Sequence, residues 1–294
     1  MDHSKRNDEH QFKENFSEYT NYENNSQKNN ISIDGQEEND SNPDNISKTI
    51  SHNKTTLLTR NWFHPRPGIK WQWQLSDKLD LSYDVDIYDV DLEEISKELI
   101  EQLHKKNIKV ICYFNAGAYE PYRNDSFLFP KEVLGKTMKD WNDEKWLDIS
   151  RFYLFKNIIT KRLDLAVTKD CDGVEPDNIN AYLEDSGFPL SFDDQLKYNK
   201  WLSSEAHKRN LSIALKNDGE QADLLIDFFD FAVVEDCFYY DDCDQYKIFI
   251  DNNKAVLGVE YFLEPKEFCK KANRFNFSFL KKNIQLDSEV IFCN

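Results

Sequence analysis

The sequence predicts an α/β protein of the (β/α)₈ TIM-barrel class, preceded by a disordered N-terminal tail. Three features support this: eight short apolar runs, amphipathic stretches between several of them, and a polar segment ahead of them all. Residues 59–294, which hold all eight runs, are about as long as the roughly 250 residues of a typical barrel. The alternative fold is a doubly wound open sheet, but no Gly-rich phosphate turn follows the first run.

Residues 1–58 differ in composition from the rest of the chain. They are rich in Asn, Ser, Asp, Glu and Lys, contain no Trp, and show no sustained apolar period. Such a segment buries too little apolar surface to offset the entropy lost on ordering. We therefore expect residues 1–58 to be a disordered polar tail and residues 59–294 to form one barrel domain.

Each apolar run is short enough to be a single buried strand. The runs cover residues 71–75, 83–88, 108–114, 171–177, 211–216, 230–235, 255–260 and 277–281. Between them, residues 91–106, 151–168 and 193–209 repeat apolar side chains at helical spacing. The link 76–82 is too short for a helix, so one helix of the ideal pattern is expected to be missing. The longest insertion is residues 116–150.

Charge and cysteine content restrict the possible functions. The net charge of -17 argues against a nucleic-acid surface and suits neutral or cationic ligands. No apolar run approaches the ~20 residues of a membrane span. The six cysteines match no zinc signature, and we expect no metal and no cofactor. Cys237 and Cys243 bracket a short loop that a disulfide could close. We expect a monomer.

Polar side chains end most of the predicted strands, where a buried strand would otherwise be apolar. In barrels, the carboxyl ends of the strands carry the active site. The residues that fit this pattern are Asp84, Asp86, Asn115, Glu175, Asp177, Lys216, Asn217, Asp218, Glu235, Glu260, Tyr261 and Lys281.

Two facing carboxylates, on the runs 171–177 and 230–235, are what glycoside hydrolysis requires. Asp177 is nearer the strand end than Glu175, so we expect Asp177 to be the nucleophile or base and Glu235 the acid. The remaining expected substrate-binding residues are Asp84, Asp86, Asn115, Glu175, Lys216, Asn217, Glu260 and Tyr261. The structural alternatives are a salt bridge of Glu235 with Lys216 or Lys281, and turn caps for Asp84 and Asp86.

Several short segments of the sequence resemble segments of one protein family, and they occur in the same order as in that family. They lie at Trp71–Leu75, Tyr83–Asp86, Val110–Ala118, Trp146–Ile149, Cys171–Asn178, Leu215–Asn217, Glu235–Cys237 and Val259–Tyr261. Together they resemble glycoside hydrolase family 114. The resemblance implies a (β/α)₈-barrel endo-α-1,4-polygalactosaminidase, in a family whose members are often labelled α-galactosidase-like. The catalytic pair it implies falls on Asp177, with Asp172 as an alternative, and on Glu235.

The leading hypothesis is a glycoside hydrolase that cleaves α-linked galactosamine or galactose polysaccharide. The alternatives are an exo-acting α-galactosidase, an aldolase-type lyase with a Schiff-base lysine at Lys216 or Lys281, and a non-catalytic carbohydrate-binding barrel. The resemblance also implies a secreted enzyme, although no signal peptide is visible at the N-terminus.

Overall fold

The computed structural model describes residues 62–293. The segment that we expect to be a disordered tail, residues 1–58, lies outside the described residues.

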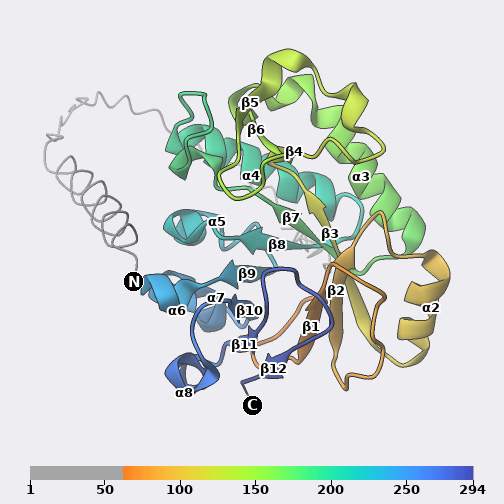
Figure 1. Ribbon diagram of the computed structural model, residues 1–294, viewed down its shortest axis with the longest axis vertical. Helices are drawn as coiled ribbons and strands as arrows, with labels where there is room; N and C mark the ends of the chain where they lie inside the picture. Colours follow the sequence, from red (N-terminus) through yellow and green to blue (C-terminus); the bar gives the residue numbers. More distant parts are fainter. Residues whose placement is uncertain (1–61, 294) are drawn as a thin grey trace, which may run out of the picture. The chain divides into compact units, whose positions relative to one another are not determined.

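One large sheet contains eight parallel strands in sequence order (Figure 1). The strands are β1 (Trp71–Gln74), β2 (Ile87–Asp91), β3 (Lys109–Asn115), β7 (Gly173–Asp177), β8 (Ser212–Lys216), β9 (Phe231–Glu235), β10 (Val256–Glu260) and β11 (Ser278–Lys281). A ninth strand, β12 (Ile291–Phe292), pairs antiparallel with β11. The parallel strands are those of the predicted (β/α)₈ barrel, and all but β2 match the expected bounds within two residues.

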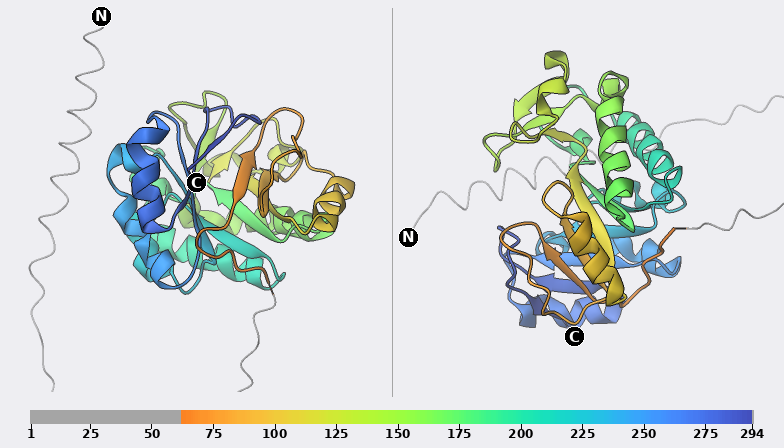
Figure 2. Two further views of the ribbon diagram at one scale, coloured as in Figure 1. Left: turned by 90° about the horizontal axis from the view of Figure 1, so that it is seen from below. Right: turned by 90° about the vertical axis from the view of Figure 1, so that its right-hand side faces the viewer.

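The sheet curls, so that its first and last parallel strands approach each other (Figure 2). Trp71 at the start of β1 donates its indole N–H to the carbonyl oxygen of Ser278 on β11, at 2.9 Å. The backbone N–H of Leu75 donates to the carbonyl of Leu286, in the segment after β11, at 2.9 Å. Among the described strands, β1 and β11 share no ladder, so a side chain and a loop close this seam.

Two apolar cores lie on the two faces of the curled sheet, because alternate strand residues point to opposite sides. The interior of the barrel is filled by Trp71, Trp73, Ile87, Ile111, Ala214, Phe231, Val233, Ala255, Leu257, Val259, Leu280 and Leu286. The larger core lies on the outer face and includes Val110, Val174 and Ile213 from the strands and Leu103, Leu163 and Leu202 from the helices.

Helices follow most strands and cover the outside of the sheet. They are α2 (Lys97–Lys105), α3 (Lys156–Lys169), α4 (Phe192–His207), α5 (Ala222–Leu225), α6 (Cys237–Tyr240), α7 (Lys247–Asp251) and α8 (Pro265–Phe275). Short 3₁₀ helices are η2 (Ser126–Leu128), η3 (Lys131–Val133), η4 (Ile149–Leu154), η5 (Ala181–Leu183), η6 (Gly219–Gln221) and η7 (Cys243–Tyr246). The three predicted helices correspond to α2, α3 and α4, and the described chain has no helix between β1 and β2, as expected.

The helices α2 and α4 begin at side-chain caps. Ser96 accepts a hydrogen bond from the backbone N–H of Leu99 at the start of α2. At the start of α4, Ser191 and Asp194 form a reciprocal capping box. Such caps satisfy N–H groups that the first helical turn leaves without partners.

The strand β2 begins four residues later than the sequence analysis predicts. Its ladder with β1 pairs Trp71 with Ile87 and Trp73 with Asp89. Asp84 and Asp86 are therefore exposed residues that precede the strand, and Asp86 accepts a hydrogen bond from the backbone N–H of Lys70, ahead of β1. The two aspartates lie at the amino ends of the strands, which corrects their expected position at the rim of the site.

The insertion after β3 contains a small sheet that the sequence analysis treats only as a long loop. Its strands β4 (Ala118–Tyr119), β5 (Leu134–Thr137) and β6 (Lys145–Leu147) pair antiparallel in the order β4-β6-β5. Figure 1 shows this sheet beyond the carboxyl end of β3. Residues of the insertion can therefore reach the carboxyl ends of the barrel strands.

All six cysteines are paired. The expected pair Cys237–Cys243 forms a disulfide with its Cα atoms 4.8 Å apart. The other two disulfides, which the sequence analysis did not specify, are Cys112–Cys171 and Cys269–Cys293.

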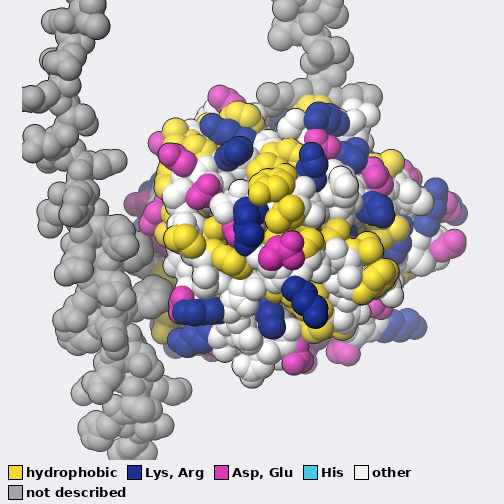
Figure 3. All heavy atoms as spheres, turned by 90° about the horizontal axis from the view of Figure 1, so that it is seen from above, with side chains coloured by type: hydrophobic (Ala, Val, Ile, Leu, Met, Phe, Trp, Pro, Cys, Tyr) yellow, Lys and Arg dark blue, Asp and Glu magenta, His cyan; other side chains and the backbone are white. Residues whose placement is uncertain are grey.

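The surface seen from above Figure 1 mixes acidic, basic and hydrophobic side chains, so the negative charge of the chain is not concentrated on this face (Figure 3). Within residues 62–293, no helix is both long enough and apolar enough to span a bilayer.

Candidate active site

The centre of the site is Lys216, the last residue of β8, whose side chain is 2% exposed. Its ammonium nitrogen lies 2.9 Å from Glu175, 2.9 Å from Asp177 and 3.3 Å from Glu235. Burial alone would favour the neutral amine, but the negative charges of these carboxylates outweigh it and hold the pKa of Lys216 well above its ordinary value. Lys216 is therefore a fixed positive charge that holds three acidic side chains together.

Strand geometry explains why these side chains meet. Glu175 and Asp177 are two residues apart on β7 and share the face that points into the barrel. Lys216 and Glu235 end the next two strands. Parallel strands bring their carboxyl ends to the same end of a barrel, which is where such enzymes hold their reacting groups.

The backbone turns sharply just after each of these strands. Asn178, Asn217 and Asp236 all have positive φ, between 50° and 61°. Asn and Asp tolerate this left-handed conformation better than most residues. The turn after β7 is crowded as well: a Cβ at Gly117 would lie 1.7 Å from the carbonyl oxygen of Asn178, so only glycine fits there.

Asp177 accepts hydrogen bonds on both oxygens. The hydroxyl of Tyr113 on β3 donates to Oδ2 at 2.9 Å. Lys216 and the backbone N–H of Asn178 donate to Oδ1, at 2.9 Å and 2.8 Å. These donors fix the orientation of a carboxylate whose side chain is 19% exposed and open to a ligand.

Glu235 is held from both sides. Asn217 donates its amide to Oε2 at 2.7 Å, and its own amide oxygen accepts the backbone N–H of Glu235 at 2.9 Å. The hydroxyl of Tyr261 donates to Oε1 at 2.7 Å. With 26% of its side chain exposed, Glu235 is the most accessible of the carboxylates around Lys216.

A second buried acid, Asp89 on β2, lies against Glu175 deeper in the barrel. Within the described chain, neither oxygen of Asp89 nor Oε2 of Glu175 accepts a hydrogen bond from an N–H or O–H group. Burial raises the pKa of Glu175 to about 7, and burial together with the charge of Glu175 raises the pKa of Asp89 well above its ordinary value. Because two carboxyl groups can hydrogen-bond only if one of them carries a proton, the raised pKa values of both acids favour a proton shared between Asp89 and Glu175.

The insertion after β3 adds another acid beside Asp177. Asn115, which pairs with Asp177 across the β3–β7 ladder, donates weakly to Glu144 at 3.4 Å. Burial, and then the charges of Glu120 and Asp177, raise the pKa of Glu144 to about 7. The negative charge of Glu120 is better compensated than that of Glu144, because Arg123 donates to both oxygens of Glu120 at 2.9 Å.

The expected site residues fall into three groups. Glu175, Asp177, Lys216, Asn217, Glu235 and Tyr261 come together around one centre, and Asn115 lies beside them. Glu260 is fully buried and accepts the backbone N–H of Phe238 at 2.8 Å, so it braces a loop instead of facing a ligand.

The remaining candidates lie at the opposite end of the barrel. Asp84 and Asp86 precede β2. Asp172, the alternative to Asp177, precedes β7 and bonds to His104 and Lys109.

Three residues of the site escaped the sequence analysis. Asp89 and Tyr113 point into the barrel from β2 and β3, and a correct register for β2 would have identified Asp89 by alternation. Glu144 lies in an irregular turn with no sequence period that could have placed it.

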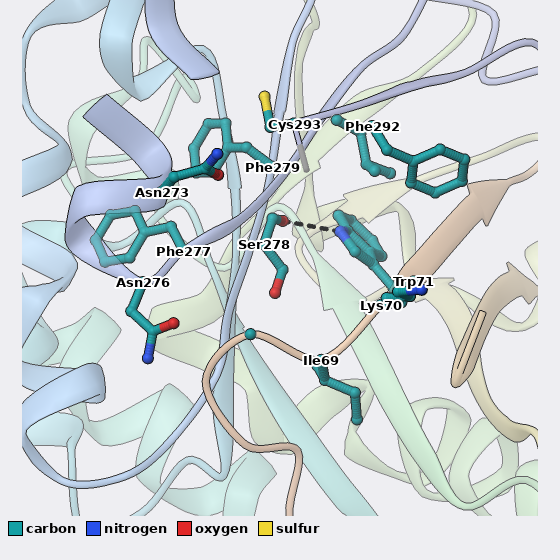
Figure 4. A pocket seen from close by; sticks show the side chains of 12 residues that line it. Ile69, Lys70, Trp71, Asn273, Asn276, Phe277, Ser278, Phe279, Phe292 and Cys293 are labelled. Carbon is teal, nitrogen blue, oxygen red and sulfur yellow. Dashed lines mark hydrogen bonds between the residues drawn. The ribbon is translucent and has the colours of Figure 1, made fainter. Parts of the chain in front are cut away.

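The site is distinct from the cavity in Figure 4, which has a volume of about 190 Å³. That cavity lies at the amino ends of β1 and β11, where Trp71, Ser278 and Asn276 line it. Among residues 62–293, no group of three or more His, Cys, Asp or Glu side chains is arranged to hold a metal ion.

Paired carboxylates at the carboxyl end of a (β/α)₈ barrel fit the class of proteins that act on glycosidic bonds. Residues 52–294 match the sequence model of glycoside-hydrolase family GH114, and the chain belongs to this family. The chain is therefore a glycoside hydrolase with a carbohydrate substrate, as the resemblance predicted.

Solved structures that are similar to this chain include those of Ega3 and PelA. The crystal structure of Aspergillus fumigatus Ega3 in complex with galactosamine has 38% sequence identity and a TM-score of 0.74, over 79% of this chain and 97% of that one. The glycoside hydrolase domain of PelA from Pseudomonas aeruginosa shares the fold, with 11% identity and a TM-score of 0.60, over 76% of this chain and 97% of that one. Among curated proteins, none matches the chain.

Proposed function

We propose that this protein hydrolyses a polysaccharide of α-1,4-linked galactosamine, with Asp177 as the nucleophile and Glu235 as the general acid and base. Membership in the family supports the reaction type. The galactosamine bound to the 38% identical Ega3 supports the sugar. The position of the two carboxylates supports the residue roles.

The observation that carries the proposal is the contact of both carboxylates with one nitrogen. Because Lys216 lies 2.9 Å from Asp177 and 3.3 Å from Glu235, the two nearest carboxylate oxygens are within about 6 Å of each other. Carboxyl groups of retaining glycosidases are separated by about 5 to 5.5 Å, and those of inverting enzymes by about 6.5 to 9.5 Å. An upper bound of about 6 Å between the nearest oxygens accommodates the shorter separation, and we propose a retaining reaction.

In a retaining reaction, an Asp177 oxygen attacks the anomeric carbon while Glu235 gives its proton to the departing glycosidic oxygen. The bond between that oxygen and the anomeric carbon breaks, and a glycosyl ester forms on Asp177. In the second step, Glu235 takes a proton from water, and the resulting hydroxide displaces Asp177 from the sugar. Asp177 leaves as a carboxylate and Glu235 is again protonated, so the cycle closes.

The charge of Lys216 assists both steps. It stabilises Asp177 as the carboxylate that attacks. Once the ester forms, Asp177 is uncharged, and Lys216 then has only Glu175 and Glu235 as anionic neighbours. The positive charge of Lys216 is then shared by fewer carboxylates, which include Glu235.

The same charge argues against the Schiff-base alternative at Lys216. A lysine that attacks a carbonyl must be neutral, and catalytic lysines have lowered pKa values. The pKa of Lys216 is raised. Lys281, the other candidate, donates its ammonium to the carbonyl oxygen of Tyr261 at 2.8 Å, outside the carboxylate cluster.

Acidic side chains also favour an amino sugar over a neutral one. Glu144 adds a carboxyl group beside Asp177, and its hydrogen bonds come from the uncharged groups of Asn115 and Tyr122. An ammonium group on the substrate would compensate this charge. Galactose, which has a hydroxyl at that position, would not.

Product analysis tests the proposal. We expect the protein to release short oligomers with new reducing ends from de-N-acetylated α-1,4-galactosamine polymer, and to act poorly on an aryl α-galactoside. Efficient release of single galactose units would support the exo-acting alternative. Binding of the polymer without new reducing ends would contradict catalysis and support a carbohydrate-binding barrel.

A further inference from the structure

Three large aromatic side chains are exposed next to the catalytic residues. Tyr239, Tyr240 and Phe262 are 46%, 60% and 63% exposed. The ring of Tyr239 lies 5.1 Å from that of Tyr240 and 5.2 Å from that of Phe262, between centroids. They form one continuous surface, which we call the aromatic platform.

The platform is built on the two loops that hold Glu235. Tyr239 and Tyr240 end the short helix α6, which begins two residues after Glu235. Phe262 directly follows Tyr261, whose hydroxyl donates to Glu235 at 2.7 Å. The platform is therefore adjacent to the proposed general acid.

Two carboxyl groups brace these loops against each other. Asp236 accepts the backbone N–H of Tyr261 at 2.7 Å, and Glu260 accepts the backbone N–H of Phe238 at 2.8 Å. The disulfide between Cys237 and Cys243 closes the α6 loop. The aromatic rings are thus exposed on a well-fixed backbone, which is a property of a binding surface more than of an unused loop.

The charges around the platform are negative. The pKa of Tyr240 is raised by burial and then by negatively charged neighbours that include Asp236, Asp140 and Asp242. Asp140 comes from the turn between β5 and β6, so the insertion contributes a negative charge that acts on Tyr240. A ligand that rests on these rings would be favoured by an apolar face and a positive charge.

We propose that Tyr239, Tyr240 and Phe262 bind galactosamine units of the polymer that lie beyond the scissile bond, on the leaving-group side. A pyranose presents an apolar face that packs on an aromatic ring, and its ammonium group is attracted by both the ring face and the surrounding aspartates. The side of the cleft follows from chemistry, because the general acid lies nearest the departing sugar. This inference rests on the proposed function.

The first test measures binding as a function of oligomer length, in the Asp177→Asn background so that the ligand is not cleaved. We expect α-1,4-galactosamine oligomers to bind more tightly than galactosamine itself. Replacing Tyr239, Tyr240 and Phe262 by Ala should weaken oligomer binding about tenfold and leave monomer binding within about twofold. Titration calorimetry measures both, and a melting curve shows that each variant is folded.

Tyr153→Ala with Phe127→Ala is the matched control, since these rings are 60% and 80% exposed but belong to η4 and η2. The inference is overturned if the platform variant keeps the full increase in affinity with oligomer length. It is also overturned if the control variant loses as much of that increase. If neither monomer nor oligomer binds and the wild type releases no reducing ends, the proposed function itself fails, which is a different result.

The second test locates the platform along the substrate. With wild-type Asp177 and an oligomer labelled at its reducing end, we expect labelled products of two or more units, because those units occupy the platform before cleavage. The platform variant should release shorter labelled products in greater proportion. An unchanged distribution of labelled products would overturn the assignment to the leaving-group side.

Discussion

At the residue scale, the site holds more carboxyl groups than positive charges. Asp89, Glu175, Asp177 and Glu235 surround the single ammonium of Lys216. They cannot all ionise without strong mutual repulsion in a buried setting. The deepest acid, Asp89, carries the largest penalty, so its proton is the one the site retains. The two outer acids, Asp177 and Glu235, can then lose and regain negative charge as the reaction requires.

The roles of the outer acids predict the outcome of isosteric replacement. Asp177→Asn and Glu235→Gln should each lower the rate of polymer hydrolysis by at least about a thousandfold, because an amide neither attacks nor transfers a proton. Reducing-end release measures the rate, and calorimetry should show retained oligomer binding. Asp185→Asn, at an 80% exposed side chain, is the control and should be fully active. Activity near wild type in either site variant would contradict the assignment.

The shared proton of Asp89 predicts that its neutral analogue is tolerated. Asp89→Asn should keep hydrolysis within about threefold of wild type, because an amide donates to Glu175 as a protonated carboxyl does. Asp89→Leu should be much less active, because Glu175 then loses its donor. The infrared difference between wild type and Asp89→Asn at pH 7 should contain the carbonyl stretch of a protonated carboxylic acid. A difference showing only ionised carboxylate would contradict the shared proton.

How far the sequence could predict these residues depended on whether they end a strand. Asp177, Lys216 and Glu235 close strands with a clear apolar run, so their meeting at one rim could be foreseen. Asp89 lies in the middle of a strand. From sequence alone an acid at such a position is assigned to the solvent side, because the partner that allows its burial is not visible. Glu144 is placed by tertiary contacts of an irregular turn, which no local pattern encodes.

At the scale of elements, the helix α6 is only four residues long and depends on its surroundings. Isolated helices of this length are unstable in water. Replacing Cys237 and Cys243 by Ser should lower the free energy of unfolding by about 2 kcal/mol. It should also weaken polymer hydrolysis, because α6 carries part of the aromatic platform. Urea unfolding and reducing-end assays measure the two effects.

The disulfide between Cys269 and Cys293 provides the comparison. It closes a longer loop, with a sequence separation of 24 against 6, so its removal should cost more stability. It joins α8 to the end of the chain, away from Glu235, so folded protein lacking it should retain hydrolysis. Equal effects of the two replacements on hydrolysis would show that α6 has no special role.

The limits of element prediction show in β2. The run Tyr83-Asp84-Val85-Asp86 alternates apolar and acidic residues, as a strand with one solvated face does. The strand that forms, Ile87–Asp91, instead turns Asp89 and Asp91 into the barrel with Ile87, and turns Tyr88 and Val90 toward the helices. Polarity alone misassigns the register when the barrel interior holds a charged site. The strands β4, β5 and β6 have two to four residues each, too few for any period.

At the scale of the whole molecule, the described chain buries several acids with raised pKa values. Burial, as the main cause, raises the pKa of Glu144, Glu175 and Glu260 to about 7, that of Asp218 to about 8, and those of Asp236 and Asp242 to about 6. In the unfolded chain these groups titrate near their ordinary values of about 4. At pH values between about 4 and the raised pKa values, the folded protein therefore binds more protons than the unfolded protein.

Stability should therefore fall as pH rises from about 5 to about 8. The free energy of unfolding decreases with pH wherever the folded state binds more protons, by about 1.4 kcal/mol per pH unit for each excess proton. The net charge of -17 acts in the same direction, because repulsion grows as the acids ionise. Burial lowers the pKa of Lys282 to about 8. This group therefore makes stability rise with pH, but only above about pH 8. Urea unfolding at a series of pH values measures the slope.

Asp218→Asn provides the site-specific control for this slope. Asp218 accepts a hydrogen bond from Asn199 at 2.8 Å, and an amide oxygen can accept that bond as well. Removing its titration should flatten the loss of stability between about pH 6 and 8, while Asp185→Asn at the surface should leave the slope unchanged. A free energy of unfolding that is constant or rises from pH 5 to pH 8 would show that these acids ionise as readily in the folded protein as in the unfolded chain.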